Sequence, residues 1–397
     1  MPLITSKSWL DPILPEALPP SIISLADALP RKTQFLAGRL PPETAARLGR
    51  LLRITNTYYS NLIEGQYTEP ADMQKAQAAP RKDRALLKTL AVKQMNVQAV
   101  FERTLRLAGT VPWPDMFAPE LVGHLHDRLF RDSTAAERIL SDGSLMQPGI
   151  LRSVTRQNVT VGNHDAPDAS AVETMLKHLQ VGFGRQIDPR RQIIAALAYH
   201  HRLAWVHPFV DGNGRVTRLI TYLQLARLGL QPTLWSLSRG LARRHEDYYR
   251  FLTMADRQRE GDLDGRGQMS QRRYFEFIEF MLDVCHDQVD YMTAALDPSQ
   301  LWDRVIRAFR YNERILKQGI QPGSAAAIIA LITQGNLPRS EIKIFTGLTP
   351  RPAISELTRL IQSGLVESAT PKSRLVTPGL PAWFAQDIFP DLHRRFQ

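Results

Sequence analysis

The stretch from His207 to Arg218, HPFVDGNGRVTR, contains side chains that could bind an anion and act on it. A Gly-Asn-Gly turn that opens a helix presents unpaired backbone N–H groups, and the helix dipole adds about half a positive charge at that end. Arg215 and Arg218 are three residues apart, so both guanidinium groups would lie on one face of the first helical turn. The pattern suits an oligophosphate better than a lone carboxylate.

Two further side chains in this stretch fit a phosphate-bearing substrate. His207 has an ordinary pKa close to neutral and could take a proton there. Asp211 would be repelled by phosphate, but its carboxylate could hold the Mg²⁺ that a nucleotide brings. A metal site built from His200, His201 and His207 is the alternative. We reject it because His200 and His201 point to different helix faces and no HExxH or Cys partner accompanies them.

The stretch is predicted to be a loop between two helices. Upstream, apolar residues recur at helical spacing up to Trp205, and Pro208 ends that helix directly after His207. Downstream, the same spacing resumes near Gly214 and ends at Gly229, where a helix would cap.

The same residues resemble the signature of the Fic (filamentation induced by cAMP) domain family, HxFx(D/E)GNGRxxR, and match every fixed position of it. The resemblance implies a mainly α-helical fold with a short β-hairpin. It also implies a protein adenylyltransferase, which moves AMP from ATP to a Ser, Thr or Tyr hydroxyl of a protein and releases pyrophosphate. Relatives with Lys in place of the second glycine act as kinases, and Gly214 argues against that activity here.

Carried over by position, the resemblance assigns a role to each fixed residue of the signature. His207 would be the base, Phe209 would anchor the loop in the core, and Asp211 would hold Mg²⁺. The nucleotide would be bound by the anion hole and the phosphate-gripping arginines, namely Gly212, Asn213, Gly214, Arg215 and Arg218.

A second motif, SNLIEG, stands at the end of a predicted helix that begins after Pro42 and is ended by Gly65. Ser60 and Glu64 are four residues apart and share one helix face, so Glu64 could pair with an arginine. The hexapeptide resembles the inhibitory motif (S/T)xxxE(G/N) found N-terminal to many Fic cores, which implies Arg218 as the partner. Such a pair would prevent the γ-phosphate of ATP from being seated for attack.

Two segments near the signature are expected to face the substrates. PGILRSVTRQNVTVGNH is rich in Val, Thr and turn residues and predicts a short β-hairpin. In Fic proteins a hairpin at this place, the flap, docks the target segment as an added strand. The resemblance implies that the target is positioned by Val159, Thr160, Val161, Gly162, Arg152 and His164. An ordinary surface hairpin is the alternative.

Downstream, SLSRGLARRHEDYYRFLTMADR is predicted to be one helix. In relatives, a tyrosine-containing helix at this place lines the adenine pocket, so Tyr248 or Tyr249 would stack on the base. Packing in the core is the alternative for one of them. The segment that follows, GDLDGRGQ, is predicted to be a flexible loop.

The C-terminal part has a different organisation, with three short predicted helices followed by two short strands about a basic turn. This order resembles a winged helix-turn-helix. Its residues that could contact DNA are Arg351, Ser355 and Arg359 on the helix that would enter a major groove, and Lys372 and Arg374 on the wing. Such modules also serve as protein docking or dimerisation platforms, and both roles stay open.

Composition limits the class of protein. The net charge of +11 favours polyanionic partners, and the single cysteine, Cys285, excludes an internal disulfide and fits a reducing compartment. No apolar run approaches the ~18 residues of a membrane span, and the N-terminus lacks the apolar core of a signal peptide. We expect a cytoplasmic protein with no membrane partner. Several prolines predict that residues 1 to about 40 are mostly extended, with at most one short helix.

The expected organisation is an N-terminal arm and inhibitory helix region over residues 1–100, a catalytic core over 101–295, a linker helix over 296–322, a winged-helix module over 323–379 and a tail over 380–397. The expected partners are ATP with Mg²⁺, a protein target with an exposed hydroxyl, and the chain itself through auto-modification; the winged helix would add DNA or a second copy of the chain. The alternative functions are transfer of another phosphate-linked group, removal of AMP at the same site, and a DNA-binding regulator that senses ATP.

Overall fold

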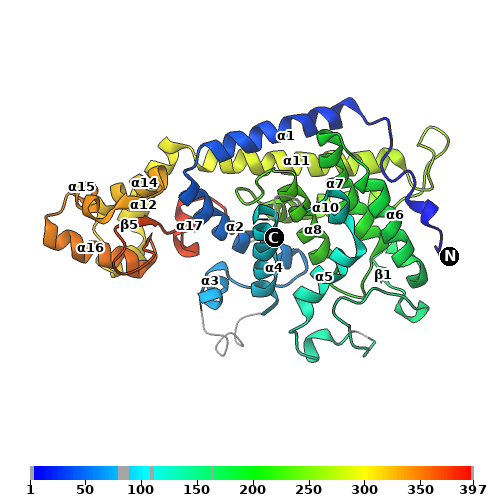
Figure 1. The fold of residues 1–397 in the computed structure, drawn as a ribbon, viewed down its shortest axis with the longest axis horizontal. Helices are drawn as coiled ribbons and strands as arrows, with labels where there is room; N and C mark the ends of the chain where they lie inside the picture. The colour runs from blue at the N-terminus through cyan, green and yellow to red at the C-terminus, as the bar shows by residue number, and fades with distance from the viewer. Residues whose placement is uncertain (1–3, 79–88, 108–110, 141, 163, 395–397) are drawn as a thin grey trace.

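A computed structural model describes residues 4–78, 89–107, 111–140, 142–162 and 164–394. The part of the chain that it describes is mainly helical (Figure 1). Two long helices, α1 (Pro20–Gly38) and α11 (Gln271–Ala295), pack against each other along one edge of the molecule. In the ranges described, no helix is both long enough and apolar enough to cross a membrane.

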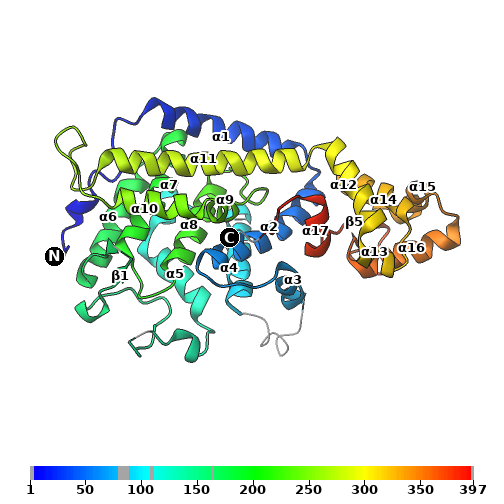
Figure 2. The ribbon, with the colours of Figure 1, turned by 180° about the vertical axis from the view of Figure 1, so that it is seen from behind.

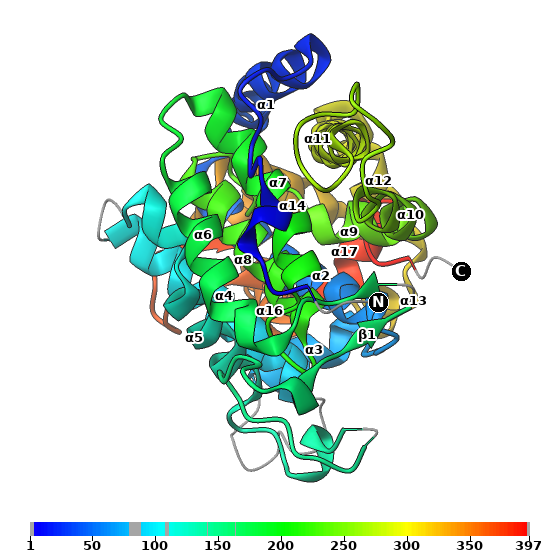
Figure 3. The same cartoon turned by 90° about the vertical axis from the view of Figure 1, so that its right-hand side faces the viewer.

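The pair α7 (Pro189–Val206) and α8 (Asn213–Arg227) forms the centre of the helical region that contains the signature stretch. Helices α6 and α11 cover α7, and helices α2, α4 and α5 pack on α8. Figure 3, which looks along the molecule, shows this arrangement around α7 and α8. The bounds of the remaining helices of this region are α2 (Pro42–Ile63), α3 (Pro70–Ala78), α4 (Thr89–Leu107), α5 (Pro119–Phe130), α6 (Val172–Gly184), α9 (Leu237–Arg243) and α10 (His245–Ala255).

The N-terminal arm differs from the sequence prediction, because nearly half of it is the 19-residue helix α1. Pro20 occupies its first turn, where a missing N–H costs nothing, but Pro30 lies inside it. A proline inside a helix costs about 3 kcal/mol. Here the cost is offset by an apolar stripe that is fully buried, and the stripe consists of Ile22, Ala26, Leu29 and Leu36. The prediction of a mostly extended arm was therefore wrong.

Helix α2 has the predicted limits. Pro42 is its first residue, and Gly65 adopts a left-handed φ of 71° just after its end. Nearly every residue from Leu48 to Ile63 is buried, because other elements cover this helix on several sides. α2 therefore holds its C-terminal end, with Ser60 and Glu64, in a fixed place beside α8.

Two predicted helices are each divided into two. The helix predicted over 236–257 is two helices, α9 and α10, because Arg244 between them has non-helical dihedral angles (φ −113°, ψ 39°). The linker is likewise two helices, α12 (Pro298–Tyr311) and α13 (Glu313–Lys317), separated by Asn312, whose side chain caps the second. A helix predicted from Asp83 is described from Thr89 onward, and its first residues lie outside the described ranges.

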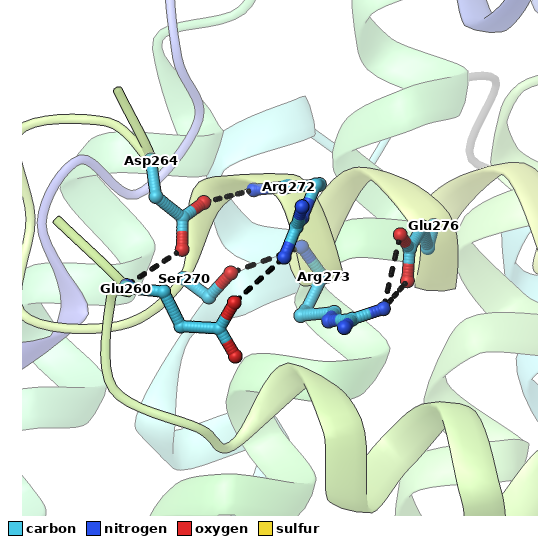
Figure 4. Close-up of polar contacts among 6 residues, drawn as sticks. All are labelled: Glu260, Asp264, Ser270, Arg272, Arg273 and Glu276. Atoms are coloured by element: carbon cyan, nitrogen blue, oxygen red, sulfur yellow. Dashed lines mark hydrogen bonds and ion pairs between the residues drawn. The ribbon is translucent and has the colours of Figure 1, made fainter. Parts of the chain in front are cut away.

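The start of α11 is fixed by a set of capping contacts (Figure 4). Ser270 is the N-cap and accepts a hydrogen bond from the backbone N of Arg273 (3.2 Å). Asp264 accepts from the backbone N of Glu260 (3.0 Å) and of Arg272 (2.9 Å), which ties the preceding loop to the helix. The middle of the segment that was predicted to be a flexible loop is therefore bound to the N-terminus of α11.

The C-terminal region contains a small antiparallel sheet with the strand order β3-β5-β4. Along the chain the order is helix, strand, helix, helix, strand, strand. The elements are α14 (Ala325–Gln334), β3 (Leu337–Pro338), α15 (Ile342–Thr346), α16 (Pro350–Ser363), β4 (Val366–Glu367) and β5 (Leu375–Pro378). Strand β3 was not predicted, and the predicted tail contains a further helix, α17 (Ala382–Ile388).

Residues after 325 contact α2 at both of its ends. At the N-terminal end, Thr44 donates to the carbonyl O of Ile332 (2.9 Å), and Arg47 forms an ion pair with Glu367. Farther along α2, the Tyr59 hydroxyl donates to the carbonyl O of Leu392 (3.1 Å). Figures 1 and 2 show the same relation, with α17 and the end of the chain beside α2 in the middle of the molecule.

Candidate active site

The signature stretch is a tight loop between α7 and α8. Helix α7 ends at Val206, and His207 then adopts a left-handed conformation (φ 50°, ψ 63°), which reverses the chain before Pro208. Gly212 also has a positive φ (81°), and a Cβ there would collide with the ring of Phe130. Helix α8 begins at Asn213, next to this turn.

Two side chains fix the loop from the inside. The Asn213 amide accepts from the backbone N of Phe209 (2.9 Å) and donates to the carbonyl O of Phe209 (2.8 Å). The Phe209 ring is fully buried and stacks on His126, with 3.8 Å between ring centroids. Asn213 therefore contributes its side chain to the shape of the loop, while its backbone remains at the first turn of α8.

His126 was not identified from the sequence, although it supports the same loop. Its Nδ1 accepts from the backbone N of Gly149 (2.8 Å), so Nε2 carries the proton and donates to the carbonyl O of Asp211 (3.1 Å). Burial lowers the pKa of His126 to about 4, and the ring therefore stays neutral at pH 7. A lone histidine on an apolar helix carries no sequence signal that would have indicated this contact.

The first two turns of α8 contain two buried arginines three residues apart. Arg215 is 4% exposed, and its Nε is buried without a hydrogen-bond partner. Its guanidinium lies over the Phe130 ring, and one Nη is 3.5 Å from Asp211. A buried cation with a free donor is costly unless an anion completes it, so this turn fits a phosphate group.

Arg218 is already occupied by the end of α2. Its Nε donates to the Ser60 hydroxyl (3.0 Å), and one Nη donates to both the Ser60 carbonyl O (2.8 Å) and the Glu64 carboxylate (2.7 Å). Arg218 is 3% exposed, whereas the Glu64 side chain is 28% exposed. Burial raises the pKa of Glu64, but the charge and hydrogen bond of Arg218 outweigh it and hold that pKa below its usual value.

Glu64 also covers the glycine turn itself. A Cβ on Gly214 would collide with Oε1 of Glu64, so the carboxylate lies directly over the second glycine of the signature. Arg218 lies beside the same position, with Nη1 at 3.1 Å from such a Cβ. The carboxylate of Glu64 and a phosphate on the α8 turn would therefore compete for one arginine and for overlapping space.

Asp211 and His207 are placed on either side of this turn. The Asp211 side chain is 53% exposed, and one of its oxygens accepts from the backbone N of Gly212 (2.6 Å). Within the described ranges, no three His, Cys, Asp or Glu side chains converge on a metal position. The open carboxylate next to an anion site fits Mg²⁺, which takes one or two protein carboxylates and completes its shell with phosphate oxygens and water.

His207 is arranged as a neutral base. Burial, and then the positive charge of Arg152, lower the pKa of His207 to about 4. Its Nδ1 lies 3.4 Å from the carbonyl O of Ala204, which places the proton on Nδ1 and leaves Nε2 as the acceptor. The two other histidines of α7 are engaged elsewhere, His200 with Thr221 and His201 with Asp256.

The two tyrosines of α10 have different surroundings. Tyr248 is 2% exposed, and its hydroxyl donates to Nε2 of His200 (2.8 Å), so it is a packed residue that cannot stack on a nucleotide base. Tyr249 is 42% exposed. A cavity of about 770 Å³ lies between the end of α2 and the start of α10, and its lining includes Gly65 and His245. Of the two tyrosines predicted to contact adenine, Tyr249 is therefore the remaining candidate.

The hairpin before the signature is shorter and later than predicted. Strands β1 (Thr160–Val161) and β2 (His164–Asp165) pair antiparallel, and the residues before Thr160 form turns rather than a strand. Thr160, Val161 and Gly162 are exposed, and Val159 is partly so. Arg152 is 1% exposed and cannot contact a target, because its guanidinium is bonded to backbone carbonyl groups of the chain.

The residues predicted to contact DNA are not equally free. Arg351 and Ser355 on α16, and Lys372 and Arg374 after β4, are exposed. Arg359 instead pairs with Glu356 (2.6 Å), whose buried carboxylate also accepts from the Ser324 hydroxyl (2.6 Å). Arg359 therefore also balances an interior charge, while about a third of its side chain stays exposed (36%).

Comparison with known proteins gives a consistent result for this region. The Fic/DOC family model matches residues 116–225. The protein adenylyltransferase Fic of Drosophila virilis is 28% identical over 202 residues, which are 50% of this chain and 36% of that protein. The corresponding protein of Drosophila willistoni is 29% identical over 168 residues, 41% of this chain and 29% of that protein. The match thus spans about a third of the length of these relatives.

A solved structure has a similar fold along nearly the whole chain. It is a Fic family protein from Desulfovibrio desulfuricans G20, with a TM-score of 0.51 and 20% sequence identity, and the alignment covers 92% of this chain and 98% of that one. The family match, the curated relatives and this fold agree with the geometry of the loop between α7 and α8. Residues 116–225 of the chain thus match the Fic/DOC family model, and its fold is similar to that of a Fic family protein.

Proposed function

We propose that the chain is a protein adenylyltransferase that transfers AMP from ATP to a hydroxyl side chain of a protein. The observation that carries the proposal lies in the first two turns of α8. There, two buried arginines, one with an unpaired Nε, lie beside a neutral histidine and an open carboxylate. This set of groups would bind an oligophosphate and its metal ion and would accept a proton from a hydroxyl group.

In the reaction, the target hydroxyl oxygen attacks the α-phosphorus of ATP. A new O–P bond forms, the bond between the α-phosphorus and the bridging oxygen breaks, and pyrophosphate leaves with the electron pair. Nε2 of His207 takes the hydroxyl proton, since Nδ1 already carries one. Arg215, Arg218 and the backbone of Gly212 to Gly214 hold the phosphates. When bound, Mg²⁺ would be held by Asp211 and would neutralise phosphate charge.

Glu64 is the proposed inhibitor of this reaction. The 2.7 Å contact with Arg218 supports the role, as does the position of the carboxylate over Gly214. ATP can be seated productively only when its γ-phosphate replaces Glu64 on Arg218. The resting enzyme is therefore slow, and its rate is set by how often the end of α2 releases that arginine.

A second activity is favoured by the same geometry. The Glu64 side chain is partly exposed and close enough to His207 to affect its pKa, so Glu64 could orient a water molecule toward a phosphate-linked product. Removal of AMP from a modified protein would then require the carboxylate that slows the forward reaction. Loss of Glu64 should abolish this hydrolysis while raising transfer, and an assay on an AMP-modified acceptor would separate the two.

For residues 323–379 we propose a winged helix-turn-helix module. The element order and the β3-β5-β4 sheet support it, as do the exposed basic residues Arg351, Lys372 and Arg374. The proposed organisation of the rest is a core over 101–295, preceded by the inhibitory region over 1–100 and followed by a linker over 296–322. A gel-shift experiment on variants of the basic residues decides whether the module binds DNA or instead docks a protein or a second copy.

The test of the proposed function uses ATP labelled at either the α- or the γ-phosphate. The Glu64→Gly protein should become labelled by the α-labelled nucleotide and not by the γ-labelled one, and His207→Ala should abolish the labelling. Labelling from the γ-position would instead indicate a kinase. Mass spectrometry of a lysate treated with Glu64→Gly protein should then find peptides with a mass increase of one AMP group at Ser, Thr or Tyr.

A further inference from the structure

The C-terminal end of α7 is closed by the segment that contains the hairpin, which we call the flap segment (residues 152–162 and 164–168). A helix normally leaves its last carbonyl groups without partners. Here four consecutive carbonyl oxygens, from Trp205 to Pro208, each accept a hydrogen bond from the flap segment. His164 Nε2 donates to the first of them, and Arg152 supplies the donors for the other three.

Arg152 makes these contacts with both its backbone and its side chain. Its backbone N donates to the carbonyl O of Pro208 (2.9 Å), its Nε to that of His207 (2.8 Å) and one Nη to that of Val206 (3.1 Å). The guanidinium is thus bonded to the backbone of the histidine that is held in the left-handed conformation. A positive charge at this place is also favoured by the negative end of the α7 dipole.

The same guanidinium reaches both legs of the hairpin. One Nη donates to the carbonyl O of Gln157 (3.2 Å), before β1, and the other to that of Pro167 (3.1 Å), after β2. Asn158 and Asp168 join the two legs a second time, through a side-chain hydrogen bond of 3.0 Å. One buried side chain therefore connects the backbone of His207 to the start and the end of the flap.

We propose that Arg152 is a positioning residue that holds the His207 backbone and the target-docking hairpin as one unit. A target strand added to the hairpin would then present its hydroxyl at a constant distance from the imidazole. The inference rests on the proposed function, because it assigns the acceptor side of that reaction. The nucleotide side is separate, since the hydrogen bonds of Arg152 go to the two legs of the flap and to the carbonyl groups of residues 206–208, which precede the glycine turn.

The charge of Arg152 gives this role a measurable signature. The charges of Arg152 and His164 from the flap segment, and of Glu64 from the end of α2, act on the pKa of the His207 imidazole. Arg152 and His164 lower the pKa of His207, and Glu64 raises it. Removing the charge of Arg152 should therefore move protonation of His207 to higher pH, whereas a variant that only loosened the fold would reduce the rate at every pH.

The experiment compares Arg152→Gln and Arg152→Lys, both in the Glu64→Gly background, by the rate of AMP transfer from pH 4 to 8. Both variants lose the bidentate contacts, so the maximal rate should fall about ten- to a hundredfold with little change in the KM for ATP. Only the Gln variant should show an acid limb displaced to higher pH, because Lys keeps the charge. Arg202→Lys is the matched control. Arg202 is a buried arginine of α7 whose guanidinium bonds to Met269 and lies over Tyr274, and its replacement should leave rate and pH profile unchanged.

A readout without catalysis separates this inference from the proposed function. Hydrogen exchange of the amides in 152–162 should become at least tenfold faster in Arg152→Gln, while exchange in α11 stays as in the parent protein. A Gln variant with the parent rate, pH profile and exchange would overturn the inference. If the Glu64→Gly protein transfers nothing from ATP, the proposed function fails, and the exchange result still decides whether Arg152 holds the flap.

Discussion

Replacing Glu64 by Gly tests the relation between α2 and the phosphate site most directly. The change removes the carboxylate that binds Arg218 at 2.7 Å and that lies over Gly214. Arg218 keeps its two contacts with Ser60, at 3.0 and 2.8 Å, so it stays ordered near its present place. The substitution should free the guanidinium for a γ-phosphate without removing the arginine from the site.

The expected magnitude follows from the contact that is lost. A hydrogen bond between charged groups contributes about 1.5–3 kcal/mol, and each ~1.4 kcal/mol corresponds to tenfold in rate. The Glu64 side chain is partly exposed and Ser60 retains Arg218, which favours the lower half of this range. Self-labelling by α-labelled ATP should therefore rise about ten- to fortyfold over the unmodified chain.

The control variants separate charge from backbone effects. Glu64→Gln keeps the size of the side chain and loses its charge, so it should give a smaller increase than Gly. Glu173→Gly places a glycine in the first turn of another helix, α6, at a surface carboxylate that pairs with Lys177, and should leave labelling unchanged. A Glu64→Gly protein that binds ATP, as measured by calorimetry, but labels itself no faster than the parent protein would refute the role of Glu64 as an inhibitor.

Four further outcomes are expected. His207→Ala in the Glu64→Gly background should bind ATP normally and transfer no AMP; residual transfer above one per cent would contradict the role of His207 as the base. Because the pKa of His207 is lowered to about 4, the imidazole is neutral above that pH, so the transfer rate should stay constant from pH 8 to about 5 and fall only below it. Ending the chain after Ile388 removes the residues that form hydrogen bonds with Thr55 and Tyr59 of α2. Self-labelling should then rise severalfold, because these contacts restrain the helix that leads to Glu64. A rate equal to that of the full chain would show that they do not restrain α2. If the C-terminal module binds DNA, a salt-dependent gel shift should be lost on Arg351→Ala with Arg374→Ala; a shift that persists, or none at any salt concentration, would favour protein docking.

The sequence alone was sufficient to predict the arrangement of those parts of the site that lie close together along the chain. From His207 to Arg218, turn residues, helix signals and charges are within twelve positions, and local rules place them on one loop and one helical turn. The pairing of Glu64 with Arg218 is a long-range contact, and helical spacing alone could not have named the arginine. Arg218 was identified as the partner because SNLIEG resembles an inhibitory motif whose partner is known in the family.

The contacts that support the site could not be predicted in this way. His126 and Arg152 act on backbone carbonyl groups, and any residue type presents a carbonyl, so the sequence of the acceptor contains no information about the bond. Arg152 was assigned to target contact because it lies in the segment that was predicted to form the hairpin, whereas its 1% exposure excludes that role. Burial depends on how the flap segment packs on α7, which no local pattern specifies.

The error in the N-terminal arm has the same cause. Proline content is a local signal for extended chain, and Pro30 by itself disfavours a helix. The buried stripe of α1 against α11, about 250 residues later in the chain, reverses that preference. Local rules therefore failed where the stabilising partner is distant in sequence, and they succeeded on α2, whose ends are marked by Pro42 and Gly65.

Helix α2 connects the two functions that the chain is proposed to combine. Its last turn holds Arg218 through Ser60 and Glu64, while its first turns contact the C-terminal module through Arg47 and Glu367. A helix transmits a rigid-body shift along its length far better than a loop does, so a ligand that moves the module on α2 would also move Glu64 relative to Arg218. By linkage, the effect is reciprocal: ATP that displaces Glu64 should change the affinity of the module for that ligand by the same factor. The contacts of Thr55 and Tyr59 with the end of the chain oppose such a shift, which is why the truncation after Ile388 and the Glu64→Gly substitution should not have additive effects on the transfer rate.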